Sequence, residues 1–334
     1  TSPFLDMMRR QRRQPNKDIT DMKLFRPLLA GLGAIALGLS AHAAGGAKHA
    51  HGPEQGWSFA KVPAGKLDKE SVQRGFQVYQ EVCSTCHGMK LLSYRNLGEP
   101  GGPFYSDEYK NANDNPLVKA IAAEIEILDP NPDENGDPVY RPAIPADQFR
   151  SPYPNDNAAK AANGGALPPD LSVITKARGH GADGDGASYI YSLMTGYKDD
   201  KIKTKTGEDG LNVNYLEFDE GETVGTLIQP TGLYYNPYFA GDTTPQWDGD
   251  PRHAPYGGFL AMPTQLLDGR VEYIDGTEAT TSQMAYDVAQ FLQWAGDPKQ
   301  GQRKSLALPV MLYLVLLAVL LWFSYKRIWR DVAH

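Results

Sequence analysis

The stretch that most constrains this chain is Cys83-Ser84-Thr85-Cys86-His87. A Cys-x-x-Cys-His run is typical of c-type haem attachment, because each thiol can add to one vinyl group on the same edge of the porphyrin while the adjacent His ligates the iron. A thioredoxin-like redox pair usually lacks the His, and a four-ligand zinc site needs a second Cys pair. The chain has only two Cys. We therefore predict one covalent haem c, held by Cys83 and Cys86, with His87 as an iron ligand.

The segment before this motif is predicted to be an amphipathic helix. Over 71–82, Val72, Phe76 and Tyr79 recur at helical spacing and share one face. The remainder contains 34 Gly and 25 Pro, so much of the chain is expected to be loop. Because both Cys are committed to haem, no disulfide is available to stabilise those loops. A loop-rich body around a rigid prosthetic group fits this composition.

The N-terminal region resembles an export signal. Lys23 and Arg26 precede the apolar run 28–39, which is short for a membrane span, and Ala41-His42-Ala43 is a small-x-small cleavage site. We predict a signal peptide over 22–43, with a retained anchor helix as the alternative. Residues 1–21 are an upstream extension without an assigned role.

A second apolar stretch lies near the C-terminus. Residues 306–323 are uncharged and would span roughly 27 Å as a helix, close to the thickness of the hydrocarbon core. Trp322 and Tyr325 are typical of a membrane interface, and Lys326 and Arg327 follow them. We predict a periplasmic domain over 44–298 and an anchor over 299–334, with a span at about 306–325 and a short cytoplasmic tail. The location is then a bacterial inner membrane, crossed once.

The exported domain is strongly acidic. Residues 44–298 carry 20 basic and 36 acidic side chains, a balance of −16. The stretch 124–137 contains six acids and no Lys or Arg: Glu124, Glu126, Asp129, Asp133, Glu134 and Asp137. Such a run is either a solvated face or a docking field that accelerates encounter with a basic partner. We expect no nucleic-acid partner.

The second axial ligand must be a His or Met that reaches the face opposite His87. Met262 is the best candidate, since Pro263 and the nearby Gly257-Gly258 suit a loop that presents one side chain. His180 and His253 stay possible as bis-His alternatives. The other Met are less suitable, being too close to His87, in predicted core helices or in the span: Met89, Met194, Met284 and Met311.

Further elements follow from periodicity. Helices are expected over 91–97, 117–128, 189–197 and 282–295, whereas 164–172 and 232–258 are expected to be loop. Residues 198–229 are polar and weakly periodic, and no element is assigned to them.

Several stretches, taken in order, resemble the cytochrome c1 family, the haem subunits of cytochrome bc1 complexes (ubiquinol–cytochrome c reductases), in a bacterial, alphaproteobacterial-like form. They are CSTCHGMKLLSYRNL at 83–97, the run at 141–193 that includes ALPPDLSVITKAR, GLYYNPYF at 232–239, LAMP at 260–263, and GTEATTSQMAYDVAQFLQWAGDP at 276–298, followed by the anchor. Residues 198–230 and 240–257 are longer than in compact members and resemble insertions in alphaproteobacterial relatives. Some relatives carry a disulfide that this chain cannot form.

The resemblance implies roles for matching residues. Cys83 and Cys86 hold the haem, His87 and Met262 ligate the iron, and Pro168 and Pro169 pack on the haem. Arg178 lies near a haem propionate, where a cation would partner a partly buried carboxylate.

The resemblance also implies a fold and a function. The fold is mostly α, a class I cytochrome c-like domain with long loops plus one C-terminal transmembrane helix. The protein takes electrons from the Rieske iron–sulfur protein and passes them to a cytochrome c, within a respiratory or photosynthetic bc1 complex that also contains cytochrome b and is expected to be dimeric. The chain itself is then a carrier with no catalytic residue, although the complex is an enzyme. The alternatives are a membrane-anchored carrier outside any complex and a haem peroxidase-like enzyme.

Overall fold

The computed structural model describes residues 47–60, 65–179, 185–207 and 211–330. The predicted extension (1–21) and signal peptide (22–43) lie outside these residues, as does His180.

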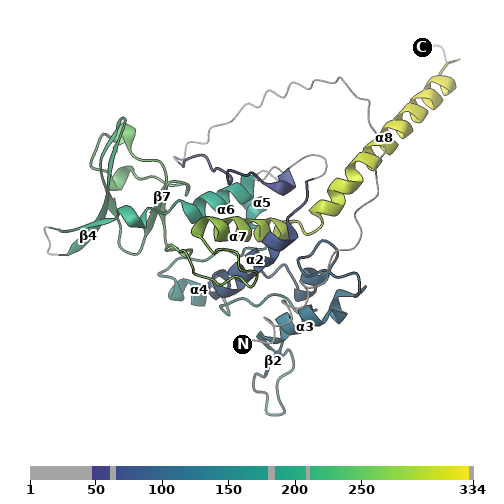
Figure 1. Cartoon of the computed structure of the whole chain (residues 1–334), viewed down its shortest axis with the longest axis horizontal. Coiled ribbons are helices and arrows are strands. Elements are labelled where there is room, and N and C mark those ends of the chain that lie inside the picture. Colours follow the sequence, from purple (N-terminus) through teal and green to yellow (C-terminus); the bar gives the residue numbers. More distant parts are fainter. Residues whose placement is uncertain (1–46, 61–64, 180–184, 208–210, 331–334) are drawn as a thin grey trace.

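The main body is built on two helices far apart in the sequence, α2 (Lys69–Glu81) and α7 (Thr281–Gly296), which pack against each other (Figure 1). The crossing is close because α2 carries Gly75, where an added Cβ would lie 2.0 Å from the backbone oxygen of Asp287. Phe76 and Phe291 meet edge to face beside it, with ring centroids 5.7 Å apart. A third helix, α6 (Asp185–Thr195), packs on α7.

A buried polar network stabilises the same crossing. The carboxylate of Asp287 is fully buried and accepts hydrogen bonds from Ser71 Oγ at 2.5 Å and Arg74 Nε at 2.9 Å. Arg74 also pairs with Asp275 at 3.0 Å, and Gln283 donates to Asp287 at 3.0 Å. A buried carboxylate is tolerated only when its oxygens are satisfied in this way.

Three of the helices predicted from hydrophobic periodicity are present in the structure. The helix predicted over 71–82 is α2, that over 282–295 is α7, and most of 189–197 lies in α6. Residues 164–172 contain no regular helix or strand in this described part of the chain. The helix expected over 91–97 is instead a 3-10 turn at Tyr94–Gly98.

The helix predicted over 117–128 is wrong in its second half. Helix α3 (Pro116–Ala123) ends early, and β1 (Glu126–Leu128) pairs antiparallel with β2 (Tyr140–Pro142). Ile125 and Ile127 pack against the core while Glu126 between them is exposed, which is the alternation of a strand. The two short helices that complete the body are α4 (Asp156–Ala162) and α5 (Ile174–Ala177).

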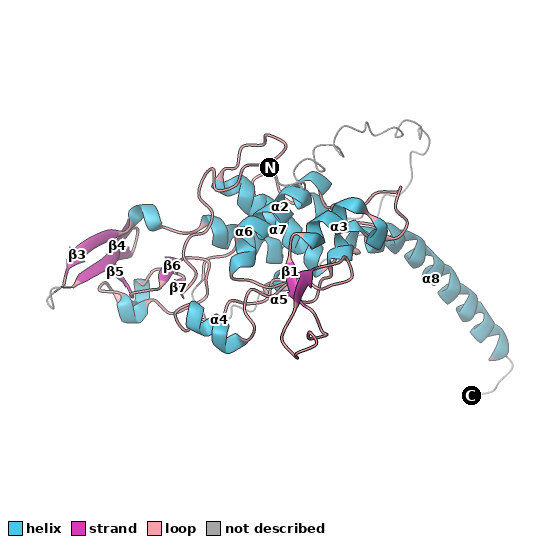
Figure 2. Cartoon of the chain, turned by 90° about the horizontal axis from the view of Figure 1, so that it is seen from below, coloured by secondary structure: helices cyan, strands magenta, loops and turns pink. Residues whose placement is uncertain are grey.

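The unassigned stretch 198–229 forms a sheet at one end of the molecule (Figure 2). Strands β3 (Lys203–Thr206), β4 (Asn212–Glu220) and β5 (Thr223–Gln229) are antiparallel neighbours in that order. Leu216 and Leu227 pack there on aromatic residues in a small second core. The expected loop 232–258 contains β6 (Tyr234–Asn236), which pairs with β7 (Gly258–Leu260). The fold stays mostly α, with these sheets added.

The predicted span lies within α8 (Gln300–Ile328), which is long and apolar enough to cross a membrane and exposes its apolar side chains. Its first turns contact the body, since Lys304 Nζ donates to Phe59 O and Gln302 Nε2 donates to Pro100 O at 3.0 Å. The views in Figures 1 and 2 place α8 and the β3–β5 sheet at opposite ends of the molecule.

Replacing Asp287 with Ala is expected to lower the free energy of unfolding by about 3–5 kcal/mol, because Arg74 then loses a buried partner. The measurement is urea unfolding of the detergent-solubilised protein followed by circular dichroism. Glu217→Gln is the control, since the Lys203–Glu217 pair is about half exposed and should contribute far less to stability. Equal effects of the two changes would contradict a stabilising role for the buried network.

Candidate functional site

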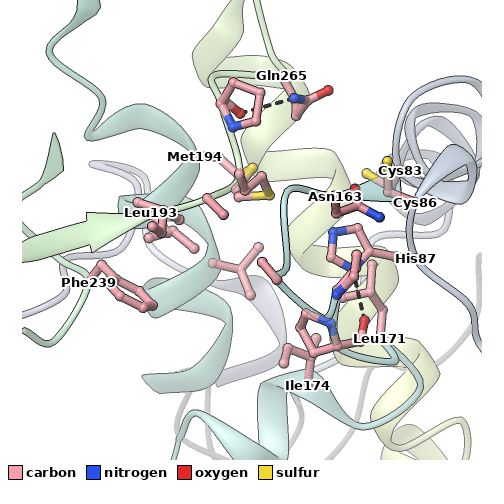
Figure 3. A pocket seen from close by; sticks show the side chains of 18 of the residues that line it. Cys83, Cys86, His87, Asn163, Leu171, Ile174, Leu193, Met194, Phe239 and Gln265 are labelled. Carbon is pink, nitrogen blue, oxygen red and sulfur yellow. Dashed lines mark hydrogen bonds between the residues drawn. The ribbon is translucent and has the colours of Figure 1, made fainter. Parts of the chain in front are cut away.

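A cavity of about 550 Å³ lies between α6, α7 and the turn that follows α2 (Figure 3). Its size falls within the range of cofactor and ligand sites in proteins. Most of its wall is apolar, with contributions from Leu171, Ile174, Leu193, Phe259, Val288 and Leu292. Two of these come from α7, so the helix that packs on α2 also forms one wall of the cavity.

The Cys-x-x-Cys-His motif lies at the edge of this cavity. It begins where α2 ends, in a 3-10 turn (Cys83–Thr85), and the backbone N–H groups of Cys86 and His87 both donate to Cys83 O, at 3.1 and 2.9 Å. This turn brings both thiols and the imidazole to the cavity. The three residues predicted to act together are therefore brought together, on a helix end held by the α2–α7 crossing.

The His87 ring is oriented by a backbone group. Its Nδ1 lies 2.8 Å from Pro169 O. A carbonyl oxygen can only accept, so Nδ1 carries the proton and the lone pair of Nε2 is free for a metal. Burial lowers the pKa of His87, which favours the neutral imidazole that iron ligation requires.

Cys83 and Cys86 form neither a disulfide with each other nor, with the other described residues, part of a zinc site. Burial, with a contribution from Cys86, raises the pKa of Cys83 to about 12. Among the described residues, no group of three His, Cys, Asp or Glu is arranged to hold a metal ion. Two thiols and one imidazole at the rim of a large apolar cavity instead fit a porphyrin, which needs two thioether links, one axial nitrogen and an apolar slot.

Two thioethers reach the cavity. Met262 follows β7 in a loop before Pro263 and lines the wall, as predicted for the second ligand. Met194 of α6 packs against the core, which is why the sequence ranks it below Met262. It nevertheless lines the same cavity. Met89 and Met284 are fully buried and do not line it.

Of the two alternative His ligands, only His253 lies in the described part of the chain. His253 does not line the cavity, and its Nε2 lies 3.2 Å from Glu222 near the β3–β5 sheet. The structure thus separates His253 from His87. His180 belongs to the residues that are not described.

The residues assigned by resemblance all line the cavity. Pro168 and Pro169 lie in the loop before α5, beside His87, and Arg178 is at the end of α5 with an exposed side chain. Sequence reasoning missed Asn163 and Gln265, polar residues in the wall. Asn163 Nδ2 donates to Tyr153 Oη at 3.0 Å, and Gln265 Nε2 donates to Pro263 O at 3.0 Å. Neither has a sequence signal that marks it in advance.

Comparison with known proteins agrees with this site. The model of the Cytochrome C1 family matches residues 57–332. The chain is similar to cytochrome c1 of Rhodospirillum rubrum, with 41% identity over 92% of this chain and 98% of the relative. It is similar to mitochondrial cytochrome c1, heme protein, of Kluyveromyces lactis, with 38% identity over 91% of this chain and 87% of the relative. It is 40% identical to cytochrome b/c1 of Bradyrhizobium diazoefficiens over 91% of its length, but spans only 39% of that longer protein.

Replacing Met262 with Leu is expected to leave the haem covalently attached but to lower its reduction potential and block turnover, because a thioether ligand raises the potential. The weak absorption near the red end of the oxidised spectrum should disappear completely. Met194→Leu is the matched control, since it removes the other thioether of the same cavity. A band that persists in Met262→Leu and is lost in Met194→Leu would move the ligand to α6.

Proposed function

The chain belongs to the cytochrome c1 family, and from this premise we propose that it passes electrons from a Rieske iron–sulfur protein to a cytochrome c. Members of the family carry one covalently bound haem c and are the electron-transfer subunit of the bc1 complex. Cytochrome c1 homologues are membrane-anchored, and the described part of this chain has one candidate span in α8. We propose in addition which residues hold the haem, which proteins are its partners and on which side of the membrane it lies.

One observation carries the proposal most directly. Both motif thiols, the His87 imidazole and a Met thioether line one apolar cavity, although His87 and Met262 are far apart in the sequence. Because Nδ1 of His87 donates to Pro169 O, Nε2 has the lone pair that can bind the iron, which supports His87 as one axial ligand. Met262 is then the second ligand.

The remaining residues tune this centre. The bound haem supplies the one-electron redox chemistry. Pro168 and Pro169 would pack on the haem, and the Pro169 carbonyl fixes the His87 tautomer. Arg178 partners a propionate, and His/Met ligation with an apolar lining gives the high potential that suits a late acceptor.

The proposed membrane arrangement combines the signal peptide predicted over 22–43, which would export the domain, with the candidate span in α8. The haem domain is then periplasmic, α8 crosses the bacterial inner membrane, and cytochrome b and the Rieske protein are the partners in a dimeric complex. A peroxidase-like enzyme would need an open iron site with a distal His; His253 lies away from the cavity, and His180 lies outside the described residues. The other rival to a subunit of the complex is an anchored carrier outside any complex.

Co-purification distinguishes these two functions. Affinity purification of this chain in mild detergent is expected to recover a cytochrome b and a Rieske protein in amounts equal to its haem c, with quinol-dependent reduction of an added cytochrome c. Met262→Leu should keep the same partners while losing that reduction, because the substitution lies inside the cavity. Recovery of the chain alone, with its haem still reducible by a soluble donor, would favour the independent carrier.

The acidic stretch 124–137 is the proposed docking field. Contacts within the hairpin show which of its acids are available to a partner. Asp129 pairs with Arg141 at 3.2 Å across the β1–β2 hairpin, so its charge is partly offset. Asp133 Oδ1 accepts from Asp137 N at 2.8 Å and Asn135 N at 2.9 Å, so Asp133 shapes the loop. The loop residues 131–140 are exposed. Glu134 and Asp137 therefore offer freely hydrated carboxylates for long-range steering.

Neutralising Glu134 and Asp137 together, as Gln and Asn, is expected to slow the reduction of a basic cytochrome c by about two- to tenfold at low salt. The difference should shrink as salt rises, because exposed charges are screened within roughly 8–10 Å at physiological ionic strength. The matched control is Asp219→Asn with Glu220→Gln, two exposed acids of β4 with the same charge change. An equal effect of both pairs would assign the slowing to net charge instead of docking at this loop.

A further inference from the structure

The loop that carries Met262 is tied to the end of α6 by two side chains. We propose that Tyr197 and Asp199 are positioning residues that hold this loop so that the Met262 thioether stays on the iron. The inference rests on the proposed function, in which Met262 is the second ligand. It concerns what keeps that ligand in place.

Two hydrogen bonds enclose the ligand position. Tyr197 Oη donates to the backbone oxygen of Met262 itself at 2.8 Å. Two residues further on, Thr264 Oγ1 donates to the carboxylate of Asp199. Both partners come from the short segment after α6, across 65 residues of sequence in each case. The Met262–Thr264 loop is thus held on both sides of Pro263.

Tyr197 is well suited to donate this bond. Burial raises the pKa of its hydroxyl, and the nearby negative charge of Asp199 raises it further. A raised pKa favours the protonated hydroxyl, which is the form that donates to the Met262 carbonyl.

The segment that carries the clamp is itself firmly placed. Asn236 is fully buried in β6 and donates through Nδ2 to Leu193 O near the end of α6, at 2.8 Å. Gly196 lets the chain turn closely past Tyr238, whose ring carbon would lie 2.5 Å from an added Cβ. Helix α6 also packs on α7. The clamp therefore transmits the position of the core helices to the loop.

The consequence concerns competition at the iron. A neutral thioether is a soft, weakly held ligand, so its occupancy depends on how well the loop is held. Strand β7 ends at Leu260, and the ladder hydrogen bonds end before Met262. Loss of one buried hydrogen bond at this point should shift the balance towards a competing ligand by roughly fivefold to tenfold.

The test measures the binding of imidazole to the oxidised haem of the purified protein or complex. In Tyr197→Phe the dissociation constant for imidazole should fall by roughly fivefold to tenfold, the near-red absorption band should weaken, and the reduction potential should drop. Thr264→Val should act in the same direction, and the double variant should exceed either single one. Thr264 is partly exposed and does not line the cavity, so this variant decides the question if Tyr197→Phe fails to assemble.

The matched control is Tyr191→Phe. Tyr191 lies within α6, and its hydroxyl is 2.8 Å from Ser282 Oγ of α7 instead of contacting the Met262 loop. It should leave the imidazole affinity unchanged. An imidazole affinity and band equal to wild type in both Tyr197→Phe and Thr264→Val would overturn the clamp, provided Met262→Leu loses the band. A band that persists in Met262→Leu would instead overturn the ligand assignment on which the clamp rests.

Discussion

The crossing of α2 and α7 is the contact on which the rest of the structure depends. Gly75 lets the two backbones approach, and the buried Asp287 carboxylate bonds groups from α2 at the same point. The haem motif begins directly where α2 ends, and α7 supplies Val288 and Leu292 to the cavity wall. A single helix pair therefore sets both the place of covalent attachment and the surface against which a porphyrin packs.

The two proposed iron ligands are held by different means. His87 lies on a helix end, and its ring is directed by the carbonyl of Pro169, so geometry and tautomer are set by backbone atoms. Met262 lies in a loop that is held from the segment after α6, by Tyr197 at the Met262 carbonyl and by Asp199 at Thr264. The His87 side combines the local turn of the motif with one tertiary contact, the Pro169 carbonyl, whereas the Met262 loop is held by tertiary contacts from the segment after α6. Substitutions on that second side are therefore the ones expected to change potential and ligand exchange without releasing the haem.

The additions to the body lie at its two ends. The β3–β5 sheet has its own small core, with Leu216 and Leu227 against Trp247, and stands away from the cavity. Helix α8 begins four residues after α7 ends and is joined to the body by Lys304 and Gln302. If α8 is the anchor, so close a junction with a core helix would orient the haem domain at the membrane, which would suit the proposed exchange of electrons with fixed partners.

Local spacing predicts the haem-attachment motif, the main helices and a candidate span: the run from Cys83 to His87, the 3.6-residue period of α2 and α7, and the uncharged run in α8. It failed at 124–128, where a two-residue alternation was taken for a helix, and it left 198–229 unassigned because a polar sheet has little periodic signal. The tertiary structure adds which distant Met side chains among the described residues reach the cavity that His87 lines, namely Met194 and Met262. That placement depends on how segments separated by more than a hundred residues pack, and local pattern carries no such information.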